Sequence, residues 1–459
     1  MEAIAEAKSK KRKKQWQTLR GMRDLLPGEQ KYWQWVINKA VDLAAAHGFL
    51  RLDTPILEEA SLFEKGTGKQ TDVVEKEMFV FEERGGAKVA LRPEFTPPFA
   101  RAYIEHGMLN LPQPVKLYTI GPLFRHDRPQ AGRYRQFHQF NAEVIGEDDP
   151  VLDAQLILLA NTLFKSCGLE VVTHINSIGS PASRQPYLEA LVAYYKRHKR
   201  SLCEDCQQRL TKNTLRLLDC KNEICQPFKG EAPQIVDWVS EEERDHFFKV
   251  VEYLDELKID YFLNPFLVRG LDYYTRTVFE FYLAEDSEGA SAESSGVSGS
   301  STTPGLGAGA QTALGGGGRY DELVELLGGR EATPAVGLAI GLERLINKIK
   351  EKEIAVPEAF QPRVFVAQLG GEARRRALLL FETLRQKGYK VMEGFSKSGL
   401  KQQLEMANRH AVEFTLIIGQ KEMLEDTILV REMDGGMQET VPFAKIVDYL
   451  QKRTTNNNQ

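Results

Sequence analysis

Residues 124–143 read FRHDRPQAGRYRQFHQFNAE, and this run decides the interpretation of the fold around it. Its arginines lie close together on either side of a turn predicted at Pro129 and Gly132, and they are Arg125, Arg128, Arg133 and Arg135. Guanidinium groups in such a loop suit phosphate or carboxylate, because each offers a planar fork of donors. Beyond the turn, strand alternation predicts one face that carries Arg135, Phe137, Gln139, Asn141 and Glu143. The run therefore predicts a cleft floor with a ring, an amide and an acid, and a solvated basic hairpin is the alternative.

A second run, LVRGLDYYTRTVFE at 267–280, places charged and phenolic side chains between apolar strand residues. Arg269, Asp272, Tyr273 and Tyr274 surround Gly270. A charged residue flanked by Leu and Val and followed by Gly is either half of a structural ion pair or a site group at a close backbone approach. The residues alone leave both interpretations open.

Two shorter runs add candidate ligands. LRPEFT at 91–96 places Glu94 and Thr96 on one face of an extended segment, where a carboxylate and a hydroxyl can hold an ammonium group. GLAIGLER at 337–344 places Glu343 and Arg344 at the start of a helix, whose partly positive end favours anions. Many ordinary helices begin in the same way, so the second run has weight only beside the others.

Common nucleotide and metal motifs are missing from the chain. It has no GxxxxGK[ST] loop, no GxGxxG after a strand and no HExxH helix. What remains is an arginine-rich ATP site on an antiparallel sheet. Guanidinium groups and a stacking ring would bind a nucleoside triphosphate, while an acid, a hydroxyl and an amide would bind an amino acid. This is the equipment of acyl-adenylate formation.

The length of 459 residues predicts several domains, and composition changes along the chain mark their limits. Residues 1–18 form a basic flexible arm, and 19–355 form an α+β catalytic domain. Within that domain, the apolar positions from Trp33 to Ala44 follow helical spacing, and Pro55 in the strand-like run after them suits a sheet edge or a subunit boundary. Residues 78–145 are predicted to be successive strands, and 186–260 to be a helical insertion. A flexible loop is expected at 287–314, where 21 of 28 residues are Gly, Ser, Ala or Thr. Residues 363–459 alternate short apolar runs with helical segments, which predicts an α/β domain with a mostly parallel sheet.

Charge and hydropathy argue against a bulk-basic nucleic-acid binder and against a membrane protein. The net charge of -4 argues against a histone-like basic protein but leaves room for a local RNA-binding face. No run approaches the roughly 18 apolar residues of a membrane span, and the N-terminus opens with charges. We therefore expect a cytoplasmic protein with no membrane contact.

Four of the five cysteines follow the pattern C-x2-C-x13-C-x4-C, at Cys203, Cys206, Cys220 and Cys225. The pattern is reminiscent of a four-thiolate zinc site, but its central spacing is short and its last pair is irregular. We expect reduced, structural cysteines and no metal in the protein.

Together these motifs closely resemble histidyl-tRNA synthetases, which are dimeric class II aminoacyl-tRNA synthetases. The resemblance covers about 19–450 and includes GMRDLLP at 21–27, LRPEFT, FRHDRPQAGRYRQFHQ, LVRGLDYY and GLER at 341–344. The run around Arg269 is the most specific, because the others recur in altered form across class II enzymes. The resemblance implies ATP with Mg²⁺ as co-substrate, L-histidine and tRNA(His) as substrates, and a homodimer. Residues 363–459 would bind the anticodon.

The resemblance also implies a role for each site residue. Arg125 and Arg344 would hold the ATP phosphates, Phe137 would stack on adenine, and Arg133 would line the nucleotide site. Histidine would be bound by the set Glu94, Thr96, Gln139, Glu143, Arg269, Tyr273 and Tyr274. Arg269 and Arg125 would be the catalytic pair, with Arg269 on the carboxylate and α-phosphate. Arg128 and Gln130 would approach the acceptor end of the tRNA.

Three features depart from the family pattern. Phe95 replaces a usual Gly and could narrow the site entrance, Asp127 replaces a usual Glu, and the Gly/Ser-rich segment separates two signature runs. The alternative function is a catalytically silent regulatory subunit of histidine biosynthesis, which resembles the core but lacks the anticodon domain and tends to lose the arginines. The presence of Arg125, Arg269 and Arg344 favours the synthetase.

Overall fold

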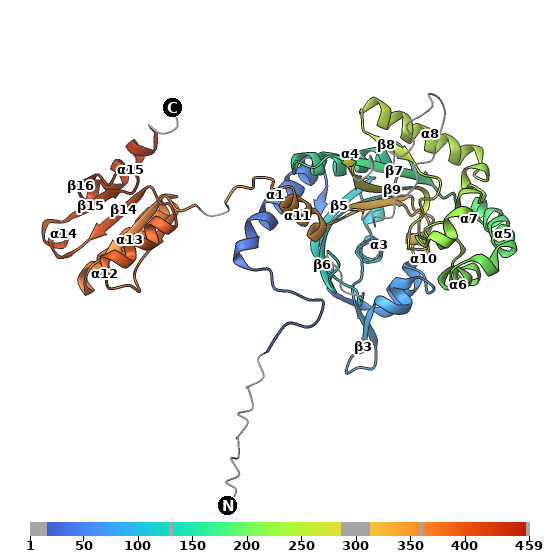
Figure 1. The fold of residues 1–459 in the computed structure, drawn as a ribbon, viewed down its shortest axis with the longest axis horizontal. Helices are drawn as coiled ribbons and strands as arrows, with labels where there is room; N and C mark the ends of the chain where they lie inside the picture. Colours follow the sequence, from blue (N-terminus) through green and yellow to red (C-terminus); the bar gives the residue numbers. More distant parts are fainter. Residues whose placement is uncertain (1–15, 128–131, 286–312, 359–360, 456–459) are drawn as a thin grey trace, which may run out of the picture. The chain divides into compact units, whose positions relative to one another are not determined.

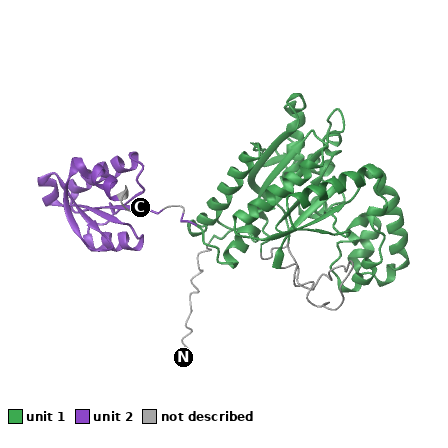
Figure 2. Ribbon diagram, turned by 90° about the horizontal axis from the view of Figure 1, so that it is seen from above, with its two compact units in different colours: residues 1–356 green, residues 357–459 purple. Residues whose placement is uncertain are grey.

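The structure is a computed structural model that describes residues 16–127, 132–285, 313–358 and 361–455. The chain divides into two compact units, Met1–Val356 and Pro357–Gln459, shown in two colours in Figure 2. Most of the predicted basic arm and of the predicted loop at 287–314 lies outside the described residues. Ala313 and Leu314, the last two residues of that predicted loop, are described, and Leu314 is buried in the core, so the prediction is wrong for this residue.

Unit 1 is organised around an eight-stranded sheet (Figure 1). The spatial order is β1-β5-β6-β11-β10-β9-β7-β8, and neighbours from β5 to β7 are antiparallel. The strands are β1 Leu50–Arg51, β5 Val115–Phe124, β6 Gln136–Ile145, β7 Val171–Ser177, β8 Tyr261–Leu263, β9 Thr275–Leu283, β10 Gly315–Arg319 and β11 Ala335–Gly341. β1 pairs in parallel with β5, and β8 pairs in parallel with β7, so these two short strands form the edges of the sheet. The segment that ends at Pro55 contains β1 and therefore lies at a sheet edge, as its proline predicted.

Long amphipathic helices pack in the core with this sheet: α1 Gln30–Ala46, α4 Val151–Ser166, α8 Glu241–Glu256 and α11 Leu342–Glu351. The buried residues of α1 are Trp33, Val36, Ala40 and Ala44, which is the helical spacing that the sequence predicted. Gly48 follows the helix with φ +79°, a conformation that glycine adopts without strain.

Shorter elements complete unit 1. They are the sheet of β2 Leu57–Glu59, β4 Lys88–Leu91 and β3 Phe79–Glu82, the helices α2 Ala60–Gly66, α3 Thr96–Glu105 and α10 Leu323–Leu326, and the insertion helices α5 Pro181–Arg197, α6 Glu204–Lys212 and α7 Gln226–Gly230. A π-helical turn covers Val73–Glu77. Tight 3-10 turns occur at Pro27–Glu29, Met108–Asn110, Lys199–Ser201, Thr214–Leu217, Glu223–Cys225, Ile235–Asp237 and, in unit 2, Phe443–Lys445.

Two sequence-based expectations for unit 1 need correction. Residues 78–145 were expected to be successive strands, but α3 interrupts them, because Pro97 and Pro98 fit the first turn of a helix and its apolar side chains are buried. The helical insertion was expected at 186–260. Its first helix already begins at Pro181, and its last, α8, packs with α4 in the main core through Phe247, Val250 and Leu254.

Unit 2 contains a five-stranded sheet in the order β13-β12-β14-β15-β16. Its elements are β12 Val364–Gln368, α12 Gly371–Gln386, β13 Val391–Glu393, α13 Leu400–Arg409, β14 Phe414–Ile418, α14 Gln420–Glu425, β15 Thr427–Glu432, β16 Gln438–Pro442 and α15 Ile446–Thr455. The first three strands pair in parallel as predicted. β15 and β16 form an antiparallel hairpin, so the sheet is mixed rather than mostly parallel. Among the described residues of both units, no helix has the length and apolar content needed to cross a membrane.

Candidate active site

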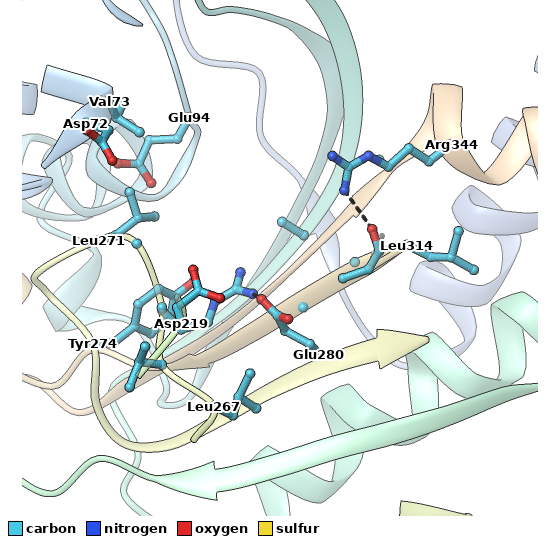
Figure 3. A pocket seen from close by; sticks show the side chains of 18 of the residues that line it. Asp72, Val73, Glu94, Asp219, Leu267, Leu271, Tyr274, Glu280, Leu314 and Arg344 are labelled. Carbon is cyan, nitrogen blue, oxygen red and sulfur yellow. Dashed lines mark hydrogen bonds and ion pairs between the residues drawn. The ribbon is translucent and has the colours of Figure 1, made fainter. Parts of the chain in front are cut away.

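A cavity of about 880 Å³ opens over the sheet of unit 1, and Figure 3 shows part of its lining. Its floor comes from β6, β9, β10 and β11. The segment 264–274 and part of the insertion, including Asp219, form another part of the wall. Every described residue that the sequence predicted for histidine or ATP lines this one cavity, namely Glu94, Thr96, Arg125, Arg133, Phe137, Gln139, Glu143, Arg269, Tyr273, Tyr274 and Arg344.

Two buried carboxyl groups lie in this lining. Glu94 accepts hydrogen bonds from the hydroxyls of Thr67 and Tyr273, the latter at 2.7 Å. Glu143 accepts from Thr96 at 2.9 Å and from the hydroxyl of Tyr320 at 2.7 Å. Burial raises the pKa of both groups, that of Glu143 to about 8. Both acids are therefore fixed in position by neutral donors, and neither forms an ion pair with another described residue, although Arg125 and Arg269 are near enough to oppose the rise in the pKa of Glu94.

The strand β11 makes room for Glu143 at a glycine. A Cβ atom at Gly337 would lie 1.8 Å from Oε2 of Glu143. Only a residue without a side chain allows the carboxyl group to lie across this strand. The position of Glu143 thus depends on the neighbouring strand as well as on its own hydroxyl partners.

Arg269 crosses the cavity from the loop before β9. It forms an ion pair with Glu280, which also accepts a hydrogen bond from Tyr282 at 2.5 Å. Its guanidinium lies 5.5 Å from the ring centre of Tyr274. Burial opposes the charge of Arg269, but Tyr274 and Glu280 outweigh it and raise the pKa. Both interpretations of the LVRGLDYY run hold, because Arg269 is part of an ion pair and also lines the site.

Three further arginines, Arg125, Arg133 and Arg344, lie close together in the cavity lining. Arg125 donates to the carbonyl of Pro93 at 2.9 Å and lies 5.5 Å from the ring centre of Phe137. Arg344 donates to the carbonyl of Ala313 at 2.7 Å, the dashed contact in Figure 3. Burial lowers the pKa of Arg344, and Arg133 and Arg125 lower it further. Like charges held this close together are typical of a site for a polyanion.

The structure places some residues differently from the sequence-based expectation. Arg135 does not line the cavity, since it precedes β6 and its N–H donates to the carbonyl of Gly21. Phe95 is fully buried beneath the guanidinium of Arg92, 4.5 Å from its ring centre, and does not narrow the entrance. Asp127 does line the cavity and pairs with Arg133 at 3.1 Å. Arg128 and Gln130 lie outside the described residues.

Sequence reasoning missed several residues of the site. Tyr320, Thr67, Glu280 and Tyr282 hold the predicted residues in place through hydrogen bonds or ion pairs. Tyr320 follows a run of glycines on β10, which is a signal of close backbone approach that could have indicated it. The insertion carries no such signal, because its contribution to the wall depends on tertiary packing.

An antiparallel sheet beneath a cavity lined by gathered arginines and two buried acids is the architecture of a class II aminoacyl-tRNA synthetase core. The sequence model of the family described as histidyl-tRNA synthetase matches residues 21–294, and the anticodon binding domain matches residues 363–453. The chain belongs to the histidyl-tRNA synthetase family.

Full-length relatives agree with this assignment. A histidine–tRNA ligase of Dehalococcoides mccartyi is 42% identical over 95% of this chain and 100% of its own length. One from Fervidobacterium nodosum is 42% identical over 92% of this chain and 95% of its own. The crystal structure of apo Staphylococcus aureus histidyl-tRNA synthetase is similar with a TM-score of 0.76 and 34% identity, over 95% of this chain and 99% of that one. The predicted class II fold is confirmed.

Proposed function

We propose that this chain is a histidine–tRNA ligase, which joins L-histidine to tRNA(His) with ATP as the energy source. The observation that carries the proposal is the meeting of two buried carboxyl groups, Arg269 and three gathered arginines in one cavity. Family membership supports the same conclusion. The chain would act in the cytoplasm, where tRNA and ATP occur together.

The arginine-rich part of the cavity binds ATP in this proposal. Arg125 and Arg344 hold the phosphates, Arg133 lines the nucleotide site, and Phe137 stacks on adenine. The support is the repulsion among these guanidiniums, which a polyphosphate would relieve. Mg²⁺ enters with ATP as part of the co-substrate.

The other part of the cavity binds histidine. Glu94, Thr96 and Gln139 bind its α-ammonium, because Glu94 offers carboxylate oxygens without a cationic partner of its own. Glu143 and Tyr274 face the imidazole, with Tyr273 beside them. A carboxyl group whose pKa lies near neutrality can accept a hydrogen bond from the imidazole or donate one to it.

The first chemical step joins the amino acid to AMP. A carboxylate oxygen of histidine forms a bond to the α-phosphorus of ATP, and the bond from that phosphorus to the bridging oxygen breaks, which releases pyrophosphate. Negative charge on the α-phosphate increases in the transition state. In this proposal Arg269 stabilises that charge, and Arg125 assists on the phosphate.

The second step transfers histidine to RNA. A hydroxyl of the 3′-terminal ribose attacks the carbonyl of the adenylate and forms the ester bond. The bond from the carbonyl carbon to the phosphate oxygen breaks, AMP leaves with the bonding electrons, and the hydroxyl proton is released. Arg128 and Gln130 would contact the acceptor end, and unit 2 would contact the anticodon. Support for the latter is the match of residues 363–453 to the anticodon binding domain.

A homodimer completes the proposal. The strands β1, β2 and β3 expose large apolar side chains, with Leu50 at 71% and Phe81 at 45% exposure. Such groups together are typical of a surface that a second copy covers. Light scattering of the purified chain would give about twice 51.9 kDa.

Histidine-dependent exchange of pyrophosphate into ATP tests the first step, and charging of tRNA(His) tests the second. The silent regulatory subunit, as the alternative, would bind histidine but show neither activity. The gathered arginines and the presence of unit 2 disfavour it. Exchange that is absent, or that proceeds equally with another amino acid, would contradict the proposed function.

A further inference from the structure

Four of the five cysteines meet in the helical insertion. The Sγ atoms of Cys203, Cys206, Cys220 and Cys225 all lie within 4.8 Å of one another, and those of Cys203 and Cys220 are 3.8 Å apart. Three of the four side chains are buried, and Cys203 is half-buried. Residues from two separate segments, 203–206 and 220–225, thus converge on one point.

This spacing fits a single metal ion. Zinc–sulfur bonds of about 2.3 Å in a tetrahedron separate the sulfur atoms by about 3.8 Å. A disulfide requires about 2.05 Å, and all five cysteines are free thiols. Tetrahedral sulfur ligands suit zinc or an iron–sulfur cluster, and a cluster would spread its ligands further apart than a single ion does.

Local backbone geometry orients the sulfur atoms. Cys203 is the N-cap of α6 and Cys206 lies in its first turn, so the start of this helix presents both side chains to the cluster. The N–H of Cys203 donates to Sγ of Cys225 at 3.3 Å, and that of Asn222 donates to Sγ of Cys220 at 3.4 Å. The side chain of Gln226 donates to the carbonyl of Cys220 at 2.7 Å, which fixes the second loop. Outer hydrogen bonds of this kind orient the ligands of metal sites.

The cysteines also lie beside the substrate cavity. The cavity lining includes four residues of the insertion, namely Arg216, Asp219, Cys220 and Lys229. The side chain of Arg216 lies beside Gly270 of the LVRGLDYY run. A Cβ atom at Gly270 would be 2.6 Å from Nη1 of Arg216. Between Lys199 and Ser240 the chain has only short helices and turns, the longest of 9 residues. A wall with so little regular structure needs another source of rigidity.

We propose that Cys203, Cys206, Cys220 and Cys225 bind one structural Zn²⁺, which holds this wall of the insertion against the substrate cavity. Binding releases the thiol protons to solvent, and the four thiolates close the coordination sphere. The ion is structural because no ligand position remains for substrate. The proposal revises the sequence-based expectation of reduced cysteines without metal.

The decisive measurement is the metal content of the full-length chain, purified without metal-affinity chromatography and analysed by mass spectrometry. We expect about one zinc per chain. Titration with a mercurial should release that zinc into a chromogenic chelator in step with modification of the clustered thiols. Cobalt substitution should give the intense visible bands of a tetrahedral thiolate site.

Variants assign the ligands. Cys206→Ser and Cys220→Ser should each lower zinc content at least tenfold, and Cys203→Ser, at the half-buried position, is the variant expected to fold best. Cys167→Ala is the matched control, because Cys167 is buried in the core beside α4 and lies outside the cluster. It should keep its full zinc. The Cys203→Ser chain should show a KM for histidine raised several-fold with a smaller change in kcat, as expected when the cavity wall loosens.

Several outcomes would overturn the proposal. Wild-type protein with four reactive thiols and less than about a tenth of a zinc per chain has no site. Two disulfides among the four cysteines would show that the thiols are oxidised rather than metal-bound. Iron in place of zinc would contradict the proposed zinc site. Full zinc in the Cys206→Ser and Cys220→Ser chains would move the site elsewhere. The wild-type measurement decides the matter even if every variant fails to fold.

Discussion

In the proposed mechanism, Arg269 stabilises negative charge that develops only in the transition state, whereas its ion pair with Glu280 is present in the free protein. Changing Arg269 to Ala should lower kcat for pyrophosphate exchange by about 100-fold, or about 3 kcal/mol, by analogy with the loss of an oxyanion donor. Binding of histidine should decrease less. Steady-state exchange kinetics give both values, and near-normal exchange would remove Arg269 from the chemistry.

The loss of Arg269 also leaves a half-buried acid without its cation, which by itself destabilises a protein. The double variant Arg269→Ala/Glu280→Gln separates the two effects, because it removes the unpaired charge. It should melt near the wild-type temperature and remain slow. Arg385→Ala, an exposed arginine on α12, is the control and should exchange normally.

Glu143 should make stability depend on pH in a specific direction. Burial raises its pKa from 4.5 to about 8, so over this range the folded chain holds a proton that the unfolded chain has released. The free energy of unfolding therefore contains a part that is complete at low pH and is lost as the pH rises through that range. Glu143→Gln removes this part, since an amide does not titrate.

Urea unfolding of both chains at about pH 5, 6.5 and 8 measures the effect. The difference between wild type and Glu143→Gln should shift against the wild type as the pH rises. Gln keeps the shape of Glu but cannot exchange a proton with the imidazole, so the variant should also raise the KM for histidine by about 2-fold to 10-fold, the value of a hydrogen bond between neutral groups. Parallel stability curves would show that Glu143 titrates normally.

At the scale of elements, the floor of the site depends on strands that carry glycine where another side chain must pass. A Cβ at Gly337 of β11 would displace the carboxyl group of Glu143, whereas one at Gly371 of α12 would meet nothing within 4 Å. Gly337→Ala should therefore raise the KM for histidine at least tenfold, and Gly371→Ala should leave it unchanged. Exchange kinetics with a melting curve for each variant test this. Unchanged binding in the Gly337→Ala chain would show that Glu143 does not contact histidine.

The elements also show what could be predicted from the sequence. Alternation along 136–145 correctly predicted which side chains of β6 face the cavity, because successive side chains of a strand point to opposite faces of the sheet. Helical spacing predicted α1 for the same kind of reason. Both are local rules that need no knowledge of the partner elements.

Other elements follow from contacts that the sequence does not display. The helix α3 was missed because Pro97 and Pro98 suggest extended chain, yet they occupy a helical first turn buried beside α10 and α2. The spacing C-x2-C-x13-C-x4-C departs from the regular pattern of a four-thiolate zinc site in its short centre and its irregular last pair. In the fold, the 3-10 turns at Thr214–Leu217 and Glu223–Cys225 absorb the irregularity and bring the sulfur atoms together.

At the scale of the whole molecule, the division at Val356 predicts a division of labour. All described residues that line the cavity lie in unit 1, between Asp72 and Arg344. A chain cut after Val356 should therefore keep much of its histidine-dependent pyrophosphate exchange, provided that it folds and dimerises. Circular dichroism and light scattering establish that condition before any activity is compared.

Charging of tRNA(His) by the same fragment should decrease sharply. Removing one hydrogen-bonded base interaction weakens binding by about 1 to 3 kcal/mol, and a domain that reads an anticodon makes several such interactions together. Without unit 2, fewer phosphates of the tRNA would be neutralised, so the dependence of tRNA affinity on salt should flatten because fewer counterions are released on binding. The full chain is the control in both assays. If the fragment charged tRNA as well as the full chain and kept the same salt slope, unit 2 would not read the anticodon, and recognition of the tRNA would have to lie entirely in unit 1.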